Sequence, residues 1–280
     1  MSPFLMSCME ANKSNTDSAN DTNSLTGEDV QFDILFLLDN SASMADENAA
    51  IVASINSFSE ALGAGSHQIA ITTASVDYTA GATGDIDPGE TGLFAAPPTL
   101  ITDSNVESIF DDAVAALGTT GSGNEEHLEG ILLSLCRQSD APPALCFESP
   151  SPITEDDIGS NDSFLRTGST LAIVIITDEG DNSRRMQQGE EDASVYLDAY
   201  QEFGHSVIVS TIGPDYDASS SAFGCNSSGA QSFTVERFAS LTNMSNGLYF
   251  PIEEDDGSGA CVMTDLESHL QEIAAHILAN

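Results

Sequence analysis

The chain has 280 residues, with 6 lysines or arginines against 45 aspartates or glutamates, so its formal net charge at pH 7 is −39. This balance excludes nucleic-acid binding, which needs clustered cations to displace counterions from phosphates, and docking on anionic lipid head groups. Hydrophobic residues make up 40% of the chain, enough for a sizeable core. No apolar run approaches the ~18 residues that span a bilayer. We expect a folded, strongly acidic protein, either soluble or held by an anchor.

The amino-terminal part carries signals of export. Leu5-Met6-Ser7-Cys8 resembles a bacterial lipobox, whose cysteine is acylated after signal cleavage, and residues 1–8 would be the remnant of the signal peptide. Residues 9–31 are rich in Ser, Asn, Asp and Thr without periodicity, which predicts a disordered polar tether. We expect an exported protein of the bacterial cell envelope or surface, periplasmic or extracellular, lipid-anchored at Cys8, with its true start upstream. The alternative is a polar tail with an incidental cysteine.

Four further cysteines are Cys136, Cys146, Cys225 and Cys261. Their spacing fits no zinc signature, because they form no C-x-x-C pair and no histidine lies at ligand spacing nearby. An even number of cysteines in a chain with export signals favours disulfides. Of the pairings that four cysteines allow, we expect Cys136–Cys146 and Cys225–Cys261. Buried reduced thiols are the alternative.

From Asp33 onward, short apolar runs alternate with segments of helical periodicity. Continuous apolar runs are typical of strands buried on both faces of a parallel sheet, and they occur at 34–38, 171–176 and 207–212, with shorter ones at 69–71 and 248–250. Apolar residues at helical spacing predict amphipathic helices that begin near Ile51, Val106, Leu128, Val195 and Leu266. This alternation predicts an α/β fold over residues 32–280: a doubly wound, mostly parallel central sheet with helices on both faces.

Polar side chains directly follow two of these predicted strands. The loop after the first strand reads Asp39-Asn40-Ser41-Ala42-Ser43, and the loop after 171–176 reads Thr177-Asp178-Glu179-Gly180-Asp181. In doubly wound sheets ligands bind at the carboxyl ends of the strands, so the two loops meet there if their strands are neighbours. Carboxylate and hydroxyl oxygens without sulfur or imidazole favour Mg²⁺, Mn²⁺ or Ca²⁺. A helix N-cap cluster is the alternative interpretation of the first loop.

The D-x-S-x-S loop after the first strand, the Thr-Asp after a central strand and the order of the helices resemble a von Willebrand factor A (vWA) domain over residues 32–279. The resemblance implies the Rossmann-like vWA fold and a metal-ion-dependent adhesion site. It also implies that Ser41 and Ser43 bind a divalent cation directly, whereas Asp39 and Asp178 act through bridging waters.

The third element of the family's site is a threonine in a Gly-rich loop, six residues before a helical leucine. Counting back from Leu128 gives Ser122, a departure in which serine supplies the hydroxyl, while Thr119 and Thr120 compete for the role. Further metal or ligand contacts are expected from Thr120, Glu179 and Asp181. The neighbouring Glu125 and Glu126 would add negative charge, form a second cation site or close the open coordination position. Arg184 and Arg185 are expected to pair with Asp181, the alternative being contact with a ligand.

The resemblance implies that a partner's carboxylate completes the coordination of the cation. We therefore expect divalent-cation-dependent, adhesion-type binding of a protein or other ligand that offers a carboxylate, with membrane contact only through the anchor. The alternative is a scaffold subunit of a larger assembly whose metal loop is stabilising or vestigial. An enzyme is not expected, since G-x-S-x-G, H-E-x-x-H and P-loop motifs are absent and the only lysine, Lys13, lies in the tether.

Overall fold

The structure is a computed structural model. The lipobox-like Cys8, residues 9–30 of the predicted tether and Ser122 lie outside the part of the chain that it describes. That part comprises residues 31–63, 65–78, 89–95, 99–100, 105–121, 125–139, 141–161, 164–187, 189–217, 222–223, 225 and 232–280.

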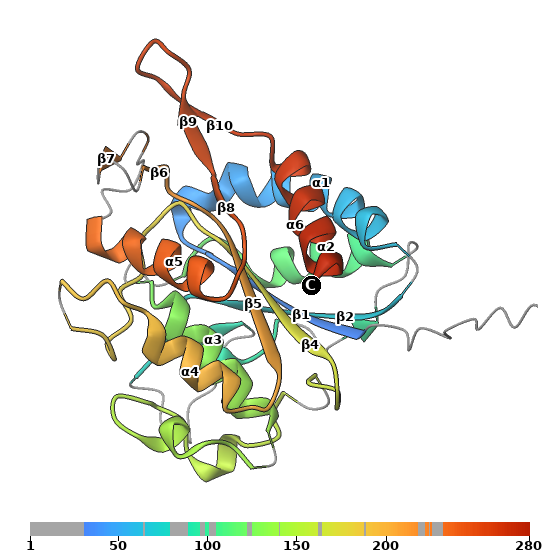
Figure 1. The fold of residues 1–280 in the computed structure, drawn as a ribbon, viewed down its shortest axis with the longest axis vertical. Helices are drawn as coiled ribbons and strands as arrows, with labels where there is room; N and C mark the ends of the chain where they lie inside the picture. The colour runs from blue at the N-terminus through green and yellow to red at the C-terminus, as the bar shows by residue number, and fades with distance from the viewer. Residues whose placement is uncertain are drawn as a thin grey trace, which may run out of the picture.

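A six-stranded sheet in the order β3-β2-β1-β4-β5-β8 runs through the centre of the molecule (Figure 1). Its strands are β1 (Gln31–Leu38), β2 (Ser66–Thr73), β3 (Thr99–Leu100), β4 (Thr170–Ile176), β5 (Ser206–Gly213) and β8 (Tyr249–Pro251). All neighbours pair in parallel except β2 and β3, which are antiparallel. The connection order reverses between β1 and β4, and ligands of doubly wound folds bind at such a reversal.

Helices cover both faces of this sheet, as the sequence predicted. One face is covered by α1 (Ala45–Leu62), α2 (Val106–Leu117) and α6 (Leu266–Ala279), and the other by α3 (His127–Gln138), α4 (Ser194–Gln201) and α5 (Ser232–Met244) (Figure 1). The predicted fold class, a doubly wound α/β sheet, is confirmed. None of the described helices is long and apolar enough to cross a membrane.

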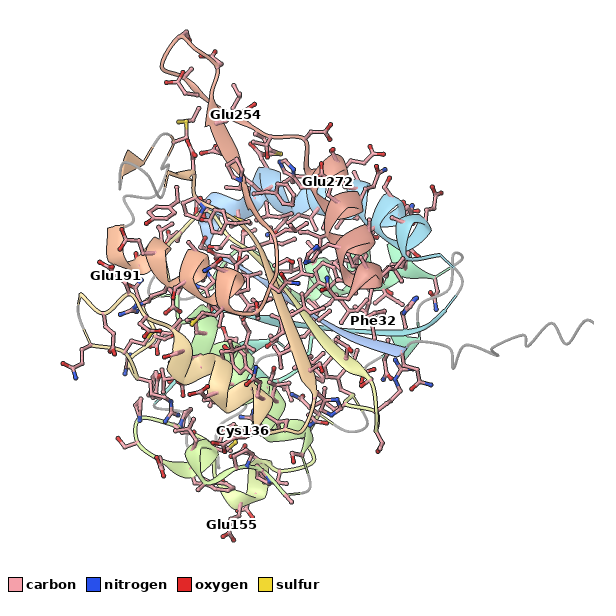
Figure 2. All side chains as sticks on the ribbon, viewed as in Figure 1. Phe32, Cys136, Glu155, Glu191, Glu254 and Glu272 are labelled. Atoms are coloured by element: carbon pink, nitrogen blue, oxygen red, sulfur yellow. A yellow bond between two sulfur atoms is a disulfide. The ribbon has the colours of Figure 1, made fainter. Side chains whose placement is uncertain are left out.

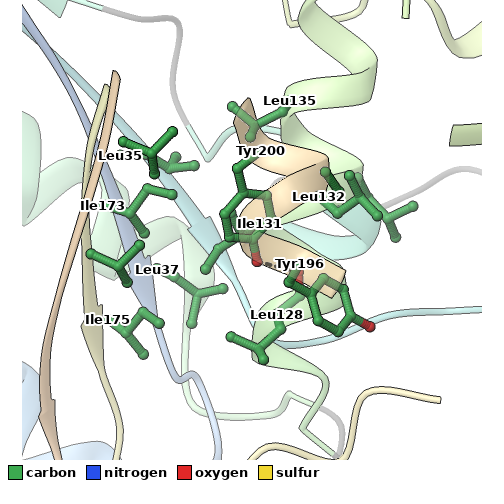
Figure 3. Close-up of a cluster of buried hydrophobic side chains, with 14 of the residues drawn as sticks. Leu35, Leu37, Leu128, Ile131, Leu132, Leu135, Ile173, Ile175, Tyr196 and Tyr200 are labelled. Carbon is green, nitrogen blue, oxygen red and sulfur yellow. Dashed lines mark hydrogen bonds between the residues drawn. The ribbon is translucent and has the colours of Figure 1, made fainter. Parts of the chain in front are cut away.

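Strand β1 is buried on both faces because successive side chains point into two different cores. On one side the ring of Phe36 packs edge-on against Phe58 and Phe110, with centroids 5.3 and 4.8 Å apart. On the other side, Leu35 and Leu37 join the cluster beneath α3 and α4 that Figure 3 shows. The burial of β1 on both faces explains its continuous apolar run. It also holds the end of the strand in place, so that the loop that begins at Asp39 has a fixed starting point.

Two short antiparallel ladders lie outside the sheet. One is the hairpin of β9 (Glu253–Asp255) and β10 (Cys261–Met263), which projects from the body of the molecule (Figure 1), with Glu254 labelled on it in Figure 2. The other pairs β6 (Tyr216–Asp217) with β7 (Ala222–Phe223). A disulfide joins Cys225, just after β7, to Cys261 in the hairpin, and a second joins Cys136 in α3 to Cys146. Both predicted pairings are confirmed.

Replacing Cys225 and Cys261 together by alanine is expected to lower the free energy of unfolding by about 3–4 kcal/mol. The bond spans a sequence separation of 36 residues. A cross-link over a loop of this length lowers the conformational entropy of the unfolded chain, which contributes about 3–4 kcal/mol to the free energy of unfolding. Urea unfolding of the variant and the wild type checks the value. A loss below about 1 kcal/mol would mean that the entropic constraint is offset in the native state.

Candidate metal centre

The loops after β1 and β4 meet because these strands are neighbours, with Leu38 opposite Ile176. The backbone N–H of Asp39 donates to the carbonyl of Ile176 at 3.0 Å, so the pairing continues past the end of β1. Beyond this point, Ser43 Oγ lies 2.9 Å from Ser41 Oγ and donates to Asp178 Oδ1 at 3.2 Å. The structure thus brings together the predicted group of Asp39, Ser41, Ser43 and Asp178.

Asp39 is fully buried and held in place by donors on both carboxylate oxygens. Its Oδ1 accepts the backbone N–H of Ser41 and its Oδ2 accepts the hydroxyl of Thr177, each at 2.8 Å. Burial alone raises the pKa of Asp39, but the adjacent His127 imidazole and these two donors outweigh burial, so the pKa lies below its ordinary value. The side chain is therefore a fixed anion, suited to organising the loop and any bridging water.

The carboxylate of Glu125, for which the sequence predicts added negative charge, a second cation site or closure of the open coordination position, interacts electrostatically with this group. Glu125 is 1% exposed, and neither of its carboxylate oxygens has a hydrogen-bond partner among the described residues. Burial, followed by the charges of Asp39, Glu179 and Asp178, raises its pKa to about 8. A buried carboxylate without a donor is costly and takes up either a proton or a cation. Glu125 thus adds a buried carboxylate without a hydrogen-bond donor to this acidic group.

The predicted third loop reaches the site through its backbone. Gly121 donates its N–H to the carbonyl of Asn40 at 3.0 Å, and the Asn40 side chain accepts the hydroxyl of Ser75 at 3.0 Å. A Cβ at Gly121 would collide with the Asn40 side chain, so a glycine is required there. Thr119 and Thr120 are exposed in this loop, and the prediction for Ser122 remains a prediction because that residue lies outside the described part.

Glu179 and Asp181, two further predicted contacts, have different surroundings. Glu179 is half-buried, and its pKa is raised by burial and by the charges of Asp39 and Asp178, which places it in the same acidic group. The Asp181 carboxylate instead accepts the backbone N–H of Leu128 at 3.0 Å and pairs with Arg237 Nη1 at 3.2 Å. Asp181 is thus occupied in holding the start of α3.

The expected pairing of Arg184 and Arg185 with Asp181 is wrong. Arg184 Nε lies 2.9 Å from Glu126 Oε1, and Arg185 Nη2 lies 2.9 Å from Glu129 Oε1. The partner of Asp181 comes from α5, 56 residues along the chain, where no local pattern links the two residues.

The donor set is made of hard oxygens. Among the residues that the structure describes, no group of three or more His, Cys, Asp or Glu side chains is placed to hold a metal by itself, so a cation here would need the serine hydroxyls as well as the carboxylates. Two hydroxyls and a crowded group of carboxylates, one of them buried without a donor, fit Mg²⁺, Mn²⁺ or Ca²⁺.

No family model matches the chain, and no curated protein matches it. Among solved structures, it is similar to an aerotolerance-related membrane protein from Bacteroides fragilis (15% identity, 90% of this chain and 100% of that chain, TM-score 0.44). It is also similar to a von Willebrand factor type A protein from Catenulispora acidiphila (12% identity, 88% of this chain and 42% of that chain, TM-score 0.46). A third similar structure is the pilus adhesin SpaC from Lactobacillus rhamnosus GG (13% identity, 89% of this chain and 30% of that chain, TM-score 0.43). The fold itself follows from the sheet order and the two helical layers. In that fold and in the loop after β1, the chain resembles von Willebrand factor A domains.

Proposed function

We propose that the chain binds a divalent cation at the carboxyl ends of β1 and β4 and, through it, a carboxylate of a protein or other ligand. The observation that carries this proposal is the contact of the Ser41 and Ser43 hydroxyls with each other and with Asp178, next to the buried, unpartnered carboxylate of Glu125. Hydroxyls and carboxylates from three separate loops converge here although their charges repel one another, and a cation would relieve that repulsion.

Each side chain would have a distinct part in this site. Ser41 and Ser43 would hold the ion directly, Asp39 and Asp178 would hold it through water, and Glu125 would supply the ligand from the third loop. When bound, the cation supplies an electrophilic centre for the incoming carboxylate. Glu125 would take the place that the family's site gives to a threonine hydroxyl. A carboxylate there holds the ion more tightly than a hydroxyl does, but its charge also weakens the attraction for an acidic partner. Ligand affinity would then depend on further contacts around the ion.

We propose in addition that the protein is exported and acts in the cell envelope or at the cell surface. The two disulfides support an oxidising compartment, in which such bonds form and persist. The lipobox-like Cys8 and the polar tether that follows it in the sequence agree with a lipid anchor. In such an arrangement the domain would bind its ligand away from the membrane.

Calorimetric titration of the full chain with Mn²⁺, Mg²⁺ and Ca²⁺ tests the cation site. The wild type is expected to bind about one ion per chain, and the double variant Ser41→Ala, Asp178→Ala is expected to lose affinity by more than about a hundredfold, since even outer-shell partners of metals are commonly worth 10–100-fold. A matched control, Ser54→Ala with Asp198→Ala, removes one hydroxyl and one carboxylate from α1 and α4 and should bind as the wild type does.

Two outcomes would contradict the proposal. A folded wild type that takes up no cation would reduce the D-x-S-x-S loop to a helix cap. If chelation lowers the melting temperature but a bound partner stays in place, the cation stabilises the domain without contacting the ligand, as the scaffold alternative requires.

A further inference from the structure

Arg184 is the only arginine of the chain whose charge is presented at the surface. Its side chain is 53% exposed, whereas those of the four other arginines are between 3% and 22% exposed and pair with carboxylates of the protein. The sequence has one further cation besides the histidines, Lys13 in the predicted tether. On the described surface of this strongly acidic protein, Arg184 is therefore the one strongly exposed arginine or lysine.

The Arg184 guanidinium is also held in a fixed position. Its Cζ lies 3.9 Å above the ring of Tyr78, a cation–π contact, and its Nε lies 2.9 Å from Glu126 Oε1. Glu126 is itself fixed, because its Oε2 accepts the Tyr78 hydroxyl at 2.5 Å and the backbone N–H of Arg184 at 3.0 Å. No hydrogen bond from Nη1 or Nη2 of Arg184 to another described residue is present. One side of the guanidinium is thus anchored, and its outer edge is available.

This guanidinium belongs to the same edge of the sheet as the candidate metal centre. The residue that anchors it, Glu126, directly follows Glu125 in the chain. The segment that carries it is bonded to the same place, since Asn182 donates its N–H to the carbonyl of Glu125 at 2.8 Å. Arg184 therefore lies on the loop that begins with Asp178, and it pairs with the residue that directly follows Glu125 in the chain.

We propose that Arg184 binds a second carboxylate of the ligand whose first carboxylate binds the cation. The ligand class would then be a dicarboxylate or a peptide segment with two acidic side chains; this inference rests on the proposed function. A guanidinium presents paired donors that match a carboxylate, and one already fixed by Tyr78 and Glu126 loses little conformational entropy on binding. It also supplies a positive charge on the loop that begins with Asp178, which would favour an acidic ligand.

Binding of small carboxylates to the Mn²⁺-loaded full chain tests this proposal. The probes are acetate, succinate, glutarate, adipate and the peptide Asp-Gly-Asp, and the measurement is the enhancement of their proton relaxation by the bound Mn²⁺. At least one dicarboxylate probe is expected to bind about tenfold more tightly than acetate, the gain of one charge-assisted contact. Arg184→Gln should remove this preference and leave acetate binding unchanged. Arg184→Lys, which keeps the charge without the paired donors, should retain part of the preference.

The remaining outcomes separate this proposal from the function on which it rests. If Mn²⁺ and acetate bind but Arg184→Gln keeps the dicarboxylate preference, the role of Arg184 is overturned and the cation site stands. If Arg184→Gln lowers the affinities for acetate and for the dicarboxylates by the same factor, Arg184 only positions Glu126, and the proposal is again overturned. If the wild type binds no Mn²⁺, or binds Mn²⁺ but no carboxylate, the proposed function and this inference fail together.

Discussion

Replacing Glu125 by glutamine is expected to stabilise the metal-free protein and at the same time remove most of its affinity for divalent cations. The wild-type carboxylate is buried with no donor on either oxygen and lies among other carboxylates. The amide has nearly the same shape and carries no charge, so the metal-free variant should be about 3 kcal/mol more stable at pH 7, because ionising this buried carboxyl costs the wild type about 1.4 kcal/mol for each pH unit above its ordinary pKa. In saturating Mn²⁺ the order should reverse, because the wild type gains binding free energy that the variant does not.

The pH dependence of this difference has a definite sign. Burial and the charges of Asp39, Glu179 and Asp178 raise the pKa of Glu125 in the folded protein to about 8, from an ordinary value of 4.5. Between these values the folded state keeps a proton that the unfolded state has lost, so metal-free wild type loses stability as the pH rises through this window. Glu125→Gln lacks this loss, and its advantage should grow from about pH 4.5 to pH 8 and then stay constant.

Thermal unfolding of both proteins, with and without Mn²⁺ across this pH range, measures the effect. Glu60→Gln, at an exposed position of α1, is the matched control and should follow the wild type in every condition. If Glu125→Gln bound Mn²⁺ as tightly as the wild type does, Glu125 would not be a ligand, and the third position of the site would have to be filled from the loop that contains Ser122.

Replacing Asp181 by asparagine is expected to destabilise the protein by about 3 kcal/mol while leaving the cation affinity of the folded protein close to that of the wild type. Asp181 is fully buried, and its carboxylate pairs with the buried guanidinium of Arg237 while accepting the N–H of Leu128 at the start of α3. Removing one partner of a buried ion pair leaves the other charge uncompensated, which costs about 3–5 kcal/mol. Arg237 keeps its bonds to backbone carbonyls, which places the expected loss at the lower end.

Urea unfolding and calorimetric titration of the same samples separate the two effects. Asp192→Asn is the control, because it removes the charge of an exposed carboxylate that also lies between β4 and α4. It should change neither the free energy of unfolding nor the cation affinity. A folded Asp181→Asn protein that had lost cation binding would make Asp181 part of the metal centre after all.

The fold was predictable because its signals are local. The run at residues 34–38 is buried on both faces of the sheet, and the helical spacing that begins at Leu128 lies in α3, which is buried on all sides from His127 to Arg137. The hairpin of β9 and β10 was not predictable in this way. Its first strand, Glu253-Glu254-Asp255, has no apolar period, and it is held by pairing with β10 and by the Cys225–Cys261 bond rather than by burial.

The residues of the candidate site likewise differ in whether a local sequence pattern predicts their position. The residues of the D-x-S-x-S loop and Asp178 directly follow buried strands, so the strand pattern alone brings them together. Glu125 depends instead on how closely α3 lies on the sheet: a Cβ on Gly130 would be 2.6 Å from the carbonyl oxygen of Thr73 at the end of β2. Only a glycine allows that approach, and no periodicity reveals it. The sequence therefore left open whether Glu125 adds charge, forms a second cation site or closes the open coordination position.

The positions of Gln31 and Asn280 determine how the domain would respond to mechanical force. Gln31 begins β1, and Asn280 is hydrogen-bonded to Asn246 just before β8, so both residues lie at the edge of the sheet opposite Asp39 and Asp178. A ligand pulled against the residues that precede Gln31 would load β1 along its own length. The strand is paired with β2 and β4 along almost its whole length and would be loaded in shear. Its hydrogen bonds must then break together rather than one after another, so the central strand should resist tension better than an edge strand that is peeled away.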